Sequence, residues 1–205
     1  AQLARYQGWQ LGSGNGVYNK AVLEFDFIPM YDMVKFRYVF TSEEYERWTC
    51  LSFNDAFGFL LSGPGINGTF SNNAINIALV PGSLAPVSVN TVNSGMVPNN
   101  ANYPDALNPF GGCFALDPNF ANNTQYYIYN GSWVQGLLGG PQTEPPYCCD
   151  PYYIQHNGLT VVMEASAAVK CGQQYHIKMA IGDISDFRVP SAVFIEQGSF
   201  MSTDR

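Results

Sequence analysis

The sequence has few charged residues, and this scarcity excludes several classes of protein. Asp, Glu, Lys and Arg make up 12% of the 205 residues, about half the usual share of roughly 25%. Long solvated helices depend on charged pairs four residues apart, so they are not a large part of this protein. The 9 Lys and Arg residues form no cluster, and the net charge is −7. This argues against a basic surface for nucleic acid or for an anionic membrane.

Long apolar runs and zinc-type cysteine spacings are also missing. The longest apolar stretches, such as 56–61 and 160–163, are far shorter than the roughly 20 residues that span a bilayer, so no membrane insertion is expected. The opening AQLARYQGW lacks the charged start and apolar run of a secretion signal, which predicts a mature or trimmed chain. There are 2 histidines and no pair of CxxC motifs, which argues against zinc.

Apolar and aromatic residues are plentiful: 46% of the chain is hydrophobic and 15% is aromatic, which suffices for a substantial core. Short alternating or β-rich segments recur between Gly, Pro and Asn residues. They predict strands near 20–28, 33–41, 56–62, 74–80, 86–92, 125–130, 158–167, 174–182 and 192–200. The only helical turn expected is in 102–108. The pattern predicts an all-β fold, an antiparallel two-sheet β-sandwich of jelly-roll-like type, formed by one domain over 1–205.

Two segments depart from this rhythm of strands. Residues 1–19 are rich in glycine and are expected to form a flexible or partner-dependent arm. Residues 93–153 are rich in Asn, Pro, Gly and Tyr, and they predict a long loop insertion stapled by disulfides. A loop of that length in a compact domain usually has a function or a bound partner.

The cysteines indicate an oxidising compartment, with two disulfides and one cysteine left over. Adjacent cysteines cannot bond to each other without strain, so Cys148 and Cys149 are expected to have different partners. The odd cysteine is a candidate for a bridge between subunits. The pairing itself stays open among the disulfide candidates, which are Cys50, Cys113, Cys148, Cys149 and Cys171.

Three Asn-x-Ser/Thr sequons are candidates for N-glycosylation where the source has that pathway. They begin at Asn67, Asn122 and Asn130. In a chain this rich in asparagine, such matches also arise by chance.

The acidic residues gather in three short segments, SEEYE at 42–46, ND at 54–55 and GDISD at 182–186. Carboxylates beside amide and backbone oxygens are what a hard cation such as calcium requires. Neighbouring side chains on a strand point to opposite faces, so the two glutamates share an ion only where the strand bulges or ends. The alternative is that these residues are solvated loop ends or turn formers. The candidate calcium ligands are Glu43, Glu44, Asp55, Asp183 and Asp186.

Exposed aromatic side chains suggest a second function, a calcium-dependent carbohydrate-binding module, because aromatic faces stack on sugar rings. The stretch QYYIYN at 125–130 offers aromatics to both faces of a strand, whereas packing one face needs only alternate residues. The other interpretation of each aromatic is ordinary core or loop packing. The candidate ligand or partner contacts are Tyr126, Tyr127, Tyr129, Trp133, Tyr152 and Tyr153.

A glycan-cleaving enzyme is the weakest hypothesis. It would need two carboxylates at the separation of a glycosidase pair, which the sequence does not supply. A serine nucleophile elbow of the form GxSxG is absent. A Cys–His pair would need a free thiol, which an oxidising compartment disfavours. No catalytic residue is therefore assigned.

Seven blocks of sequence follow one another in a specific order. They are FDFIP (25–29), FRYVFTSEEYERWTC (36–50), FNDAFGFLLSGPGING (53–68), NIALVPGS (76–83), PVSVNTVN (86–93), YHIKMAIGDISD (175–186) and SAVFIEQGSF (191–200). In sequence and in order, these blocks resemble the choice-of-anchor L domain family. The resemblance implies an extracellular module of a secreted bacterial surface protein. Residues 94–153 match poorly, the opening is shorter than the family implies, and no anchoring tail follows GSF.

Together these observations predict a non-catalytic extracellular surface module for adhesion or structural self-assembly, for example a filament or sheath subunit, with calcium as a structural cofactor. A surface with so little charge is easily buried between subunits. The expected partners are other copies of the chain, other surface proteins or glycans.

Overall fold

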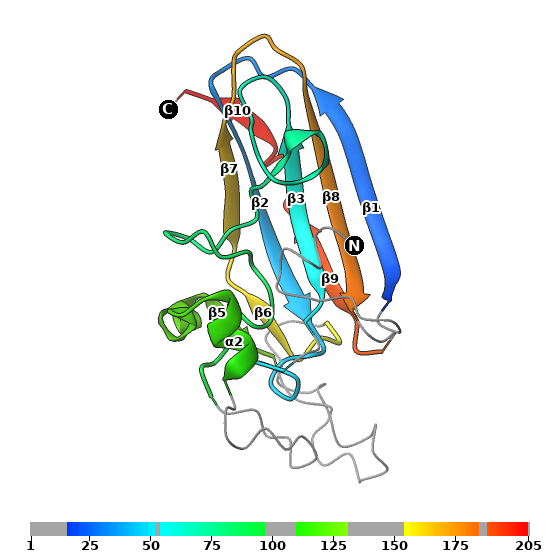
Figure 1. Ribbon diagram of the computed structural model, residues 1–205, viewed down its shortest axis with the longest axis vertical. Coiled ribbons are helices and arrows are strands. Elements are labelled where there is room, and N and C mark those ends of the chain that lie inside the picture. The colour runs from blue at the N-terminus through cyan, green and yellow to red at the C-terminus, as the bar shows by residue number, and fades with distance from the viewer. Residues whose placement is uncertain (1–15, 52–53, 97–109, 131–153, 185–187, 205) are drawn as a thin grey trace.

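Two antiparallel sheets face each other in the computed structural model, which describes residues 16–51, 54–96, 110–130, 154–184 and 188–204 (Figure 1). The first sheet has the order β1 (Val17–Phe27), β8 (Tyr175–Ile184), β3 (Ala56–Ser62) and β4 (Ile75–Asn76). The second is built on β2 (Met33–Ser42), which pairs with β10 (Met201–Thr203), β9 (Ser191–Ile195), β7 (Met163–Ala168) and β6 (Gly158–Thr160); β6 in turn pairs with β5 (Tyr127–Tyr129). The predicted antiparallel two-sheet β-sandwich is confirmed.

Aromatic side chains from β2 and β3 fill the space between the sheets. Phe36, Tyr38 and Phe40 alternate along β2 and are buried, because successive strand residues point to opposite faces. The rings of Phe36 and Phe59 lie 4.8 Å apart, and those of Phe40 and Phe57 lie 5.4 Å apart. The alternation that predicted these strands therefore also predicts which face of each strand forms the core.

Most of the predicted strands are present, with changes in length. The segments near 20–28, 33–41, 56–62 and 174–182 correspond to β1, β2, β3 and β8. The segment 158–167 contains two strands, β6 and β7, and 192–200 reaches only from β9 into a turn before β10. That turn includes Gly198 at φ 74°, a left-handed conformation that favours glycine. The strand expected at 125–130 is limited to β5, and the one at 74–80 to β4.

The strand expected at 86–92 is wrong, because residues 88–91 form a turn and only Pro86 makes an isolated β-bridge, to Leu79. The Ser88 backbone N–H donates to the Thr91 hydroxyl at 2.9 Å, and the Thr91 N–H donates to the Ser88 carbonyl at 3.2 Å. Such local bonds compete with a strand ladder for backbone groups. Val87, Val89 and Val92 are nevertheless fully buried, so the apolar pattern indicated burial correctly and conformation incorrectly.

The helices gather at one end of the sandwich, beside β5 (Figure 1). They are α2 (Gly111–Leu116) and the 3-10 helix η2 (Phe120–Tyr126); a further 3-10 turn, η1 (Ser71–Asn73), precedes β4. The helical turn expected at 102–108 lies outside the described residues. The sequence gives no periodic signal for α2, which is held by the Cys50–Cys113 disulfide and by ring contacts of Phe120 with Phe110 and Phe114. Within the described ranges, no helix is long and apolar enough to cross a membrane.

Candidate functional site

The acidic segments, far apart in the sequence, meet at the end of the sandwich where β2, β3 and β8 are joined to loops. Glu43, Glu44, Asp55 and Asp183 are all buried, with at most 5% of each residue exposed. The backbone N–H of Asp55 donates to the Glu44 carboxylate at 3.3 Å. These carboxylates are therefore not solvated loop ends; they are buried at the same end of the sandwich, and we call the four residues the acidic cluster.

Asp55 holds the two sheets together at this end. One carboxylate oxygen accepts the backbone N–H of Ile184, at the end of β8, at 3.2 Å. The other accepts the hydroxyl of Ser191, at the start of β9, at 2.7 Å. Since β8 and β9 belong to different sheets, one side chain links them. Hydrogen bonds to a charged acceptor are among the stronger ones in proteins.

Asp183 supports an irregularity in β1. The pairing of β1 with β8 shifts register between Tyr18 and Ala21, and the Asn19 side-chain amide in this bulge donates to the Asp183 carboxylate at 2.8 Å. Gly182 makes the close approach feasible, because a Cβ there would lie 2.8 Å from a methyl group of Val17. The Gly-Asp pair thus has a structural explanation on β8.

Glu43 differs from its neighbours in electrostatics. Burial raises the pKa of its carboxyl to about 7, because removal from water disfavours the charged form. Its backbone N–H donates to the Pro190 carbonyl at 3.1 Å, and its carbonyl accepts the Asn157 side-chain amide at 2.9 Å. The main chain of Glu43 is therefore firmly held, while its side chain carries a proton up to near-neutral pH.

The acidic cluster, as described, does not amount to a calcium site. Both carboxylate oxygens of Asp55 already accept protein hydrogen bonds, and one oxygen of Asp183 accepts another. In the described part of the chain, no group of three or more His, Cys, Asp or Glu residues is placed to hold a metal ion. Asp186 lies outside the described residues. Calcium binding at these residues stays a prediction.

The described aromatic candidates do not share one exposed surface. Tyr127 is partly buried, and its ring lies 4.9 Å from that of Tyr45, which is fully buried. Burial also raises the pKa of Tyr127. Tyr126 packs against the core, whereas Tyr129 is 51% exposed. The remaining candidates, Trp133, Tyr152 and Tyr153, lie outside the described residues.

One disulfide is present in the described residues, and it joins Cys50 to Cys113. It fixes α2 against the turn that follows β2, and it fits the expected oxidising compartment. Cys171 is an exposed free thiol. Cys148 and Cys149 lie outside the described residues, so their predicted pairing with different partners is not placed.

The three sequons differ in their surroundings. Asn67 and Asn122 are exposed. Asn130 is buried, and its side-chain nitrogen donates to the carbonyls of Ile154 at 3.3 Å and His156 at 2.9 Å. Because that nitrogen would carry a glycan, the folded structure argues against glycosylation of Asn130.

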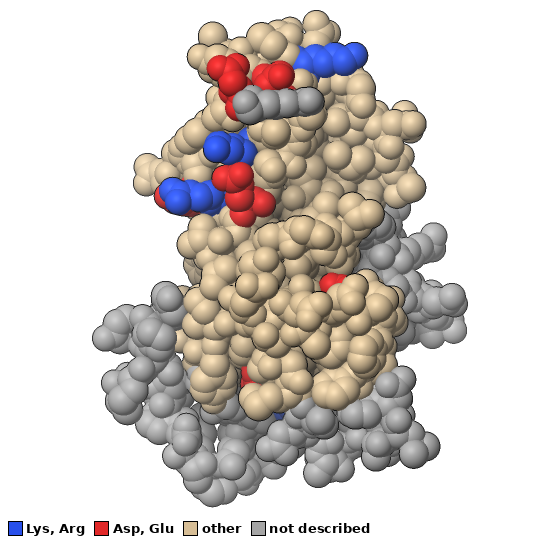
Figure 2. Space-filling model, turned by 90° about the vertical axis from the view of Figure 1, so that its left-hand side faces the viewer, with Lys and Arg blue, Asp and Glu red and all other residues tan. Residues whose placement is uncertain are grey.

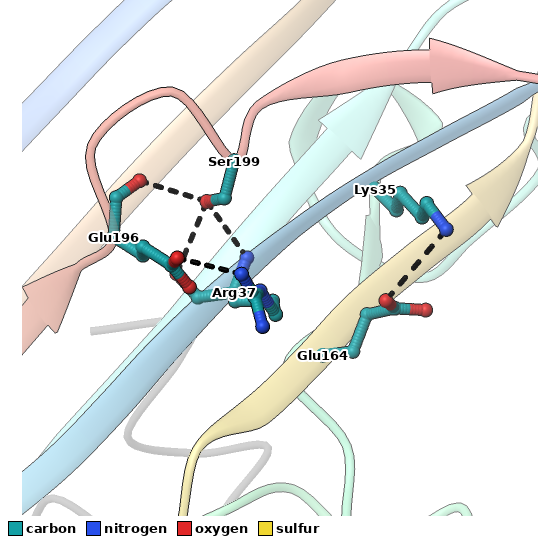
Figure 3. A network of polar contacts seen from close by, with 5 residues as sticks. All are labelled: Lys35, Arg37, Glu164, Glu196 and Ser199. Atoms are coloured by element: carbon teal, nitrogen blue, oxygen red, sulfur yellow. Dashed lines mark hydrogen bonds and ion pairs between the residues drawn. The ribbon is translucent and has the colours of Figure 1, made fainter.

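The outer face of the second sheet has a compact network of charged residues (Figure 3). Arg37 bonds to Glu196 at 2.6 Å, and Lys35 lies 3.9 Å from Glu164. Ser199 accepts the backbone N–H of Arg37 at 3.0 Å and donates to the Glu196 carbonyl at 2.8 Å. This network holds the turn between β9 and β10 against β2. It gives a structural role to Glu196 and Ser199 of the EQGS sequence at 196–199.

The network is one of few charged features on that side of the molecule. In Figure 2, red and blue side chains of the described residues gather toward one end, while most of the remaining described surface is uncharged. The groove beside the network, of about 330 Å³, is lined by these same paired charges. We therefore interpret the network as structural.

An apolar groove of about 250 Å³ opens between β1 and β9. Among the described strands, β1 pairs with β8 and β9 pairs with β2. The register places most of the side chains that line the groove on the core-facing sides of their strands, and Val22 and Ala180 on the other face. The core-facing ones are Ala21 and Leu23 from β1, Met179 and Ile181 from β8, and Val193 and Ile195 from β9, together with Phe57 and Phe59 from β3.

Two of these core-facing side chains are open to solvent. Leu23 is 55% exposed and Ile195 is 40% exposed, although the residues opposite them in the sheets, Met179 and Tyr38, are buried. Val22 on the other face of β1 is also exposed and extends the apolar surface. The described strands therefore leave this side of the sandwich open. The alternating sequence pattern does not predict the groove, and the only sequence signal of it is the apolar run AVL at 21–23 within a strand that otherwise alternates.

Comparison with known families gives one finding that covers nearly the whole chain. The sequence model of the Choice-of-anchor L domain matches residues 4–201. No curated protein and no solved structure matches the chain. The family is one of surface-associated modules, and the resemblance seen in the motifs is confirmed. The matched range includes the acidic cluster, the groove and residues 4–15 ahead of β1.

Proposed function

The chain belongs to the choice-of-anchor L domain family, and from that premise we propose that it is a non-catalytic extracellular module for structural self-assembly at the cell surface. The observation that carries this proposal is the open groove between β1 and β9, where Leu23 and Ile195 are exposed on the core-facing sides of their strands. Exposed contiguous apolar surface on a folded domain marks interaction sites.

The energetics of the groove favour its being covered. Fully burying a Leu or Ile side chain stabilises a structure by about 1.5–3 kcal/mol, so covering two such side chains that are roughly half exposed contributes about 2 kcal/mol. β1 also lies at the edge of its sheet among the described strands. An edge strand offers backbone groups to another chain. Adhesion to another surface protein would use the same groove.

We further propose that calcium binds at the acidic cluster. What supports it is that acidic segments separated by more than 100 residues, such as Asp55 and Asp183, meet in one buried cluster. Calcium would act there as a structural ion that neutralises the buried carboxylates. The cluster and the groove both involve β8 and β9, so an ion would stiffen the strands that line the groove.

The test is the mass of the protein in solution, measured by light scattering after size exclusion over a range of concentrations, in calcium and then in a chelator. We expect mass to rise with concentration, and more steeply in calcium. Assembly that is equal in both buffers would remove calcium from the proposal. A protein that stays monomeric at high concentration in both buffers would contradict self-assembly itself.

A further inference from the structure

Resting on the proposed self-assembly, we propose that the groove between β1 and β9 receives residues 1–11 of a second copy of this chain, added as a strand along β1. Over residues 21–27, β1 pairs with β8 and with no other described strand. Extended segments bind sheet edges through main-chain hydrogen bonds, and they gain specificity from alternate side chains that enter a groove. The groove beside β1 supplies both requirements.

The apolar lining of the groove favours an inserted strand that is apolar and carries little charge. Its exposed side chains, Leu23 and Ile195, lie on opposite walls, one from each sheet. An inserted strand would cover both of them at once, which a flat surface contact would not do. It would also shield the core aromatic side chains that line the groove, such as Phe57, from solvent.

Residues 1–11 have the composition that this groove requires. In an extended conformation, Leu3, Trp9 and Leu11 fall on the same side as Arg5 and Gln7, so the continuous apolar part of that side is at Trp9 and Leu11. Arg5 is the only charged side chain of the segment, and its sign is opposite to the net charge of −7 of the chain. The family match begins at residue 4, so most of this segment belongs to the domain unit.

The connection to β1 favours exchange between copies. Three of the five residues in 12–16 are glycine, and glycine permits backbone conformations that other residues rarely adopt. Five extended residues reach at most about 17 Å. The same groove contacts form whichever copy provides the segment, and exchange of an identical element is a low-cost route to assembly. Because each copy carries one segment and one groove, the contact is head-to-tail and propagates into a chain of subunits.

The experiment mixes two full-length variants that are defective at opposite ends of this contact. The segment variant carries Trp9→Ser and Leu11→Ser, and the groove variant carries Leu23→Thr and Ile195→Thr. Leu84→Thr is the matched control, because Leu84 is 84% exposed and does not line the groove. Circular dichroism verifies that each variant is folded, and light scattering gives the masses.

We expect the wild type and the control to assemble equally, and each defective variant alone to need at least tenfold higher concentration. The equimolar mixture should form a species with the mass of two chains, since the groove of the segment variant still accepts the segment of the groove variant. A mixture that stays monomeric would show that the segment of one copy does not bind the groove of another and would overturn the proposal. Defective variants that assemble as well as the wild type would also overturn it, while leaving self-assembly through another surface intact. Failure of the wild type to assemble would instead contradict the proposed function.

Discussion

At the scale of single residues, the buried carboxylates have two different physical roles. The Asp55 carboxylate accepts the Ile184 N–H and the Ser191 hydroxyl, so it works as a link between strands. Glu43 is buried in a setting that raises the pKa of its carboxyl to about 7. A proton on Glu43 therefore removes the cost of burying a charge, and this makes the stability of the domain sensitive to pH.

The pH dependence has a definite sign. Between the ordinary value of 4.5 and about 7, the folded state binds more protons at Glu43 than the unfolded state does. The free energy of unfolding therefore falls as pH rises through this range. In Glu43→Gln the side chain cannot ionise, so we expect a higher melting temperature than wild type at about pH 8 and a smaller difference near pH 5.

Thermal melting across this range, in the presence of a chelator, checks the prediction. Glu164→Gln is the control, because Glu164 is largely exposed and pairs with Lys35 at the surface, where an ion pair contributes little. Parallel pH profiles for the wild type and Glu43→Gln would contradict the role assigned to burial. A calcium ion bound at Glu43 would favour its ionised form and would weaken the slope when calcium is added.

At the scale of elements, the short helix α2 depends on a covalent constraint more than on its own sequence. It has 6 residues, too few to be stable alone in water. Cys113 on this helix is joined to Cys50, and the Gly112 N–H donates to the Cys50 carbonyl at 2.9 Å. The disulfide therefore holds the helix against the turn that follows β2.

Replacing both cysteines, Cys50→Ser and Cys113→Ser, is expected to lower the free energy of unfolding. The bridge closes a loop of 63 residues, and the entropy of such a closure corresponds to roughly 4 kcal/mol. Urea unfolding of the wild type with and without a reductant, and of the double variant, measures the loss. Cys171→Ser is the matched control, since Cys171 is an exposed free thiol. Equal midpoints for the double variant and the wild type would contradict a stabilising role.

At the scale of the whole molecule, scarce charge and an open apolar groove both favour contacts that do not depend on ion pairs. Lys35 and Arg37 are paired with Glu164 and Glu196 on their own sheet, so they are not arranged to attract a charged partner. The groove exposes Leu23 and Ile195. Contacts between copies are thus expected to depend on apolar burial and backbone hydrogen bonds.

The dependence of assembly on salt follows from this. Copies with a net charge of −7 repel each other. Salt screens this repulsion, because the Debye length falls to about 3 Å at 1 M ionic strength. Assembly is therefore expected to persist or strengthen when sodium chloride is raised from about 0.05 M to about 1 M. Light scattering at fixed protein concentration provides the measurement. Dissociation at high salt would mean that ion pairs hold the copies together.

The sequence determined the sandwich, the faces of its main strands and the family. Alternation along 33–41 and 56–62 is enough to assign β2, β3 and their buried rings, because side-chain direction in a strand is a local property. The motif blocks identified the family because each is a contiguous stretch of sequence that can be recognised without the structure. Local patterns also favoured a strand at 86–92, where hydrogen bonds between Ser88 and Thr91 prevail.

Only the tertiary structure decided what the acidic motifs and β1 do. Whether Asp55 meets Ile184 and Ser191 depends on contacts across more than 100 residues, which no local period encodes. The same is true of the groove: Leu23 has the pattern of a core residue, and its exposure depends on the distance between β1 and β9 in space. Burial is a property of the assembled sheets, so the sequence could indicate apolar side chains there without indicating that they remain uncovered.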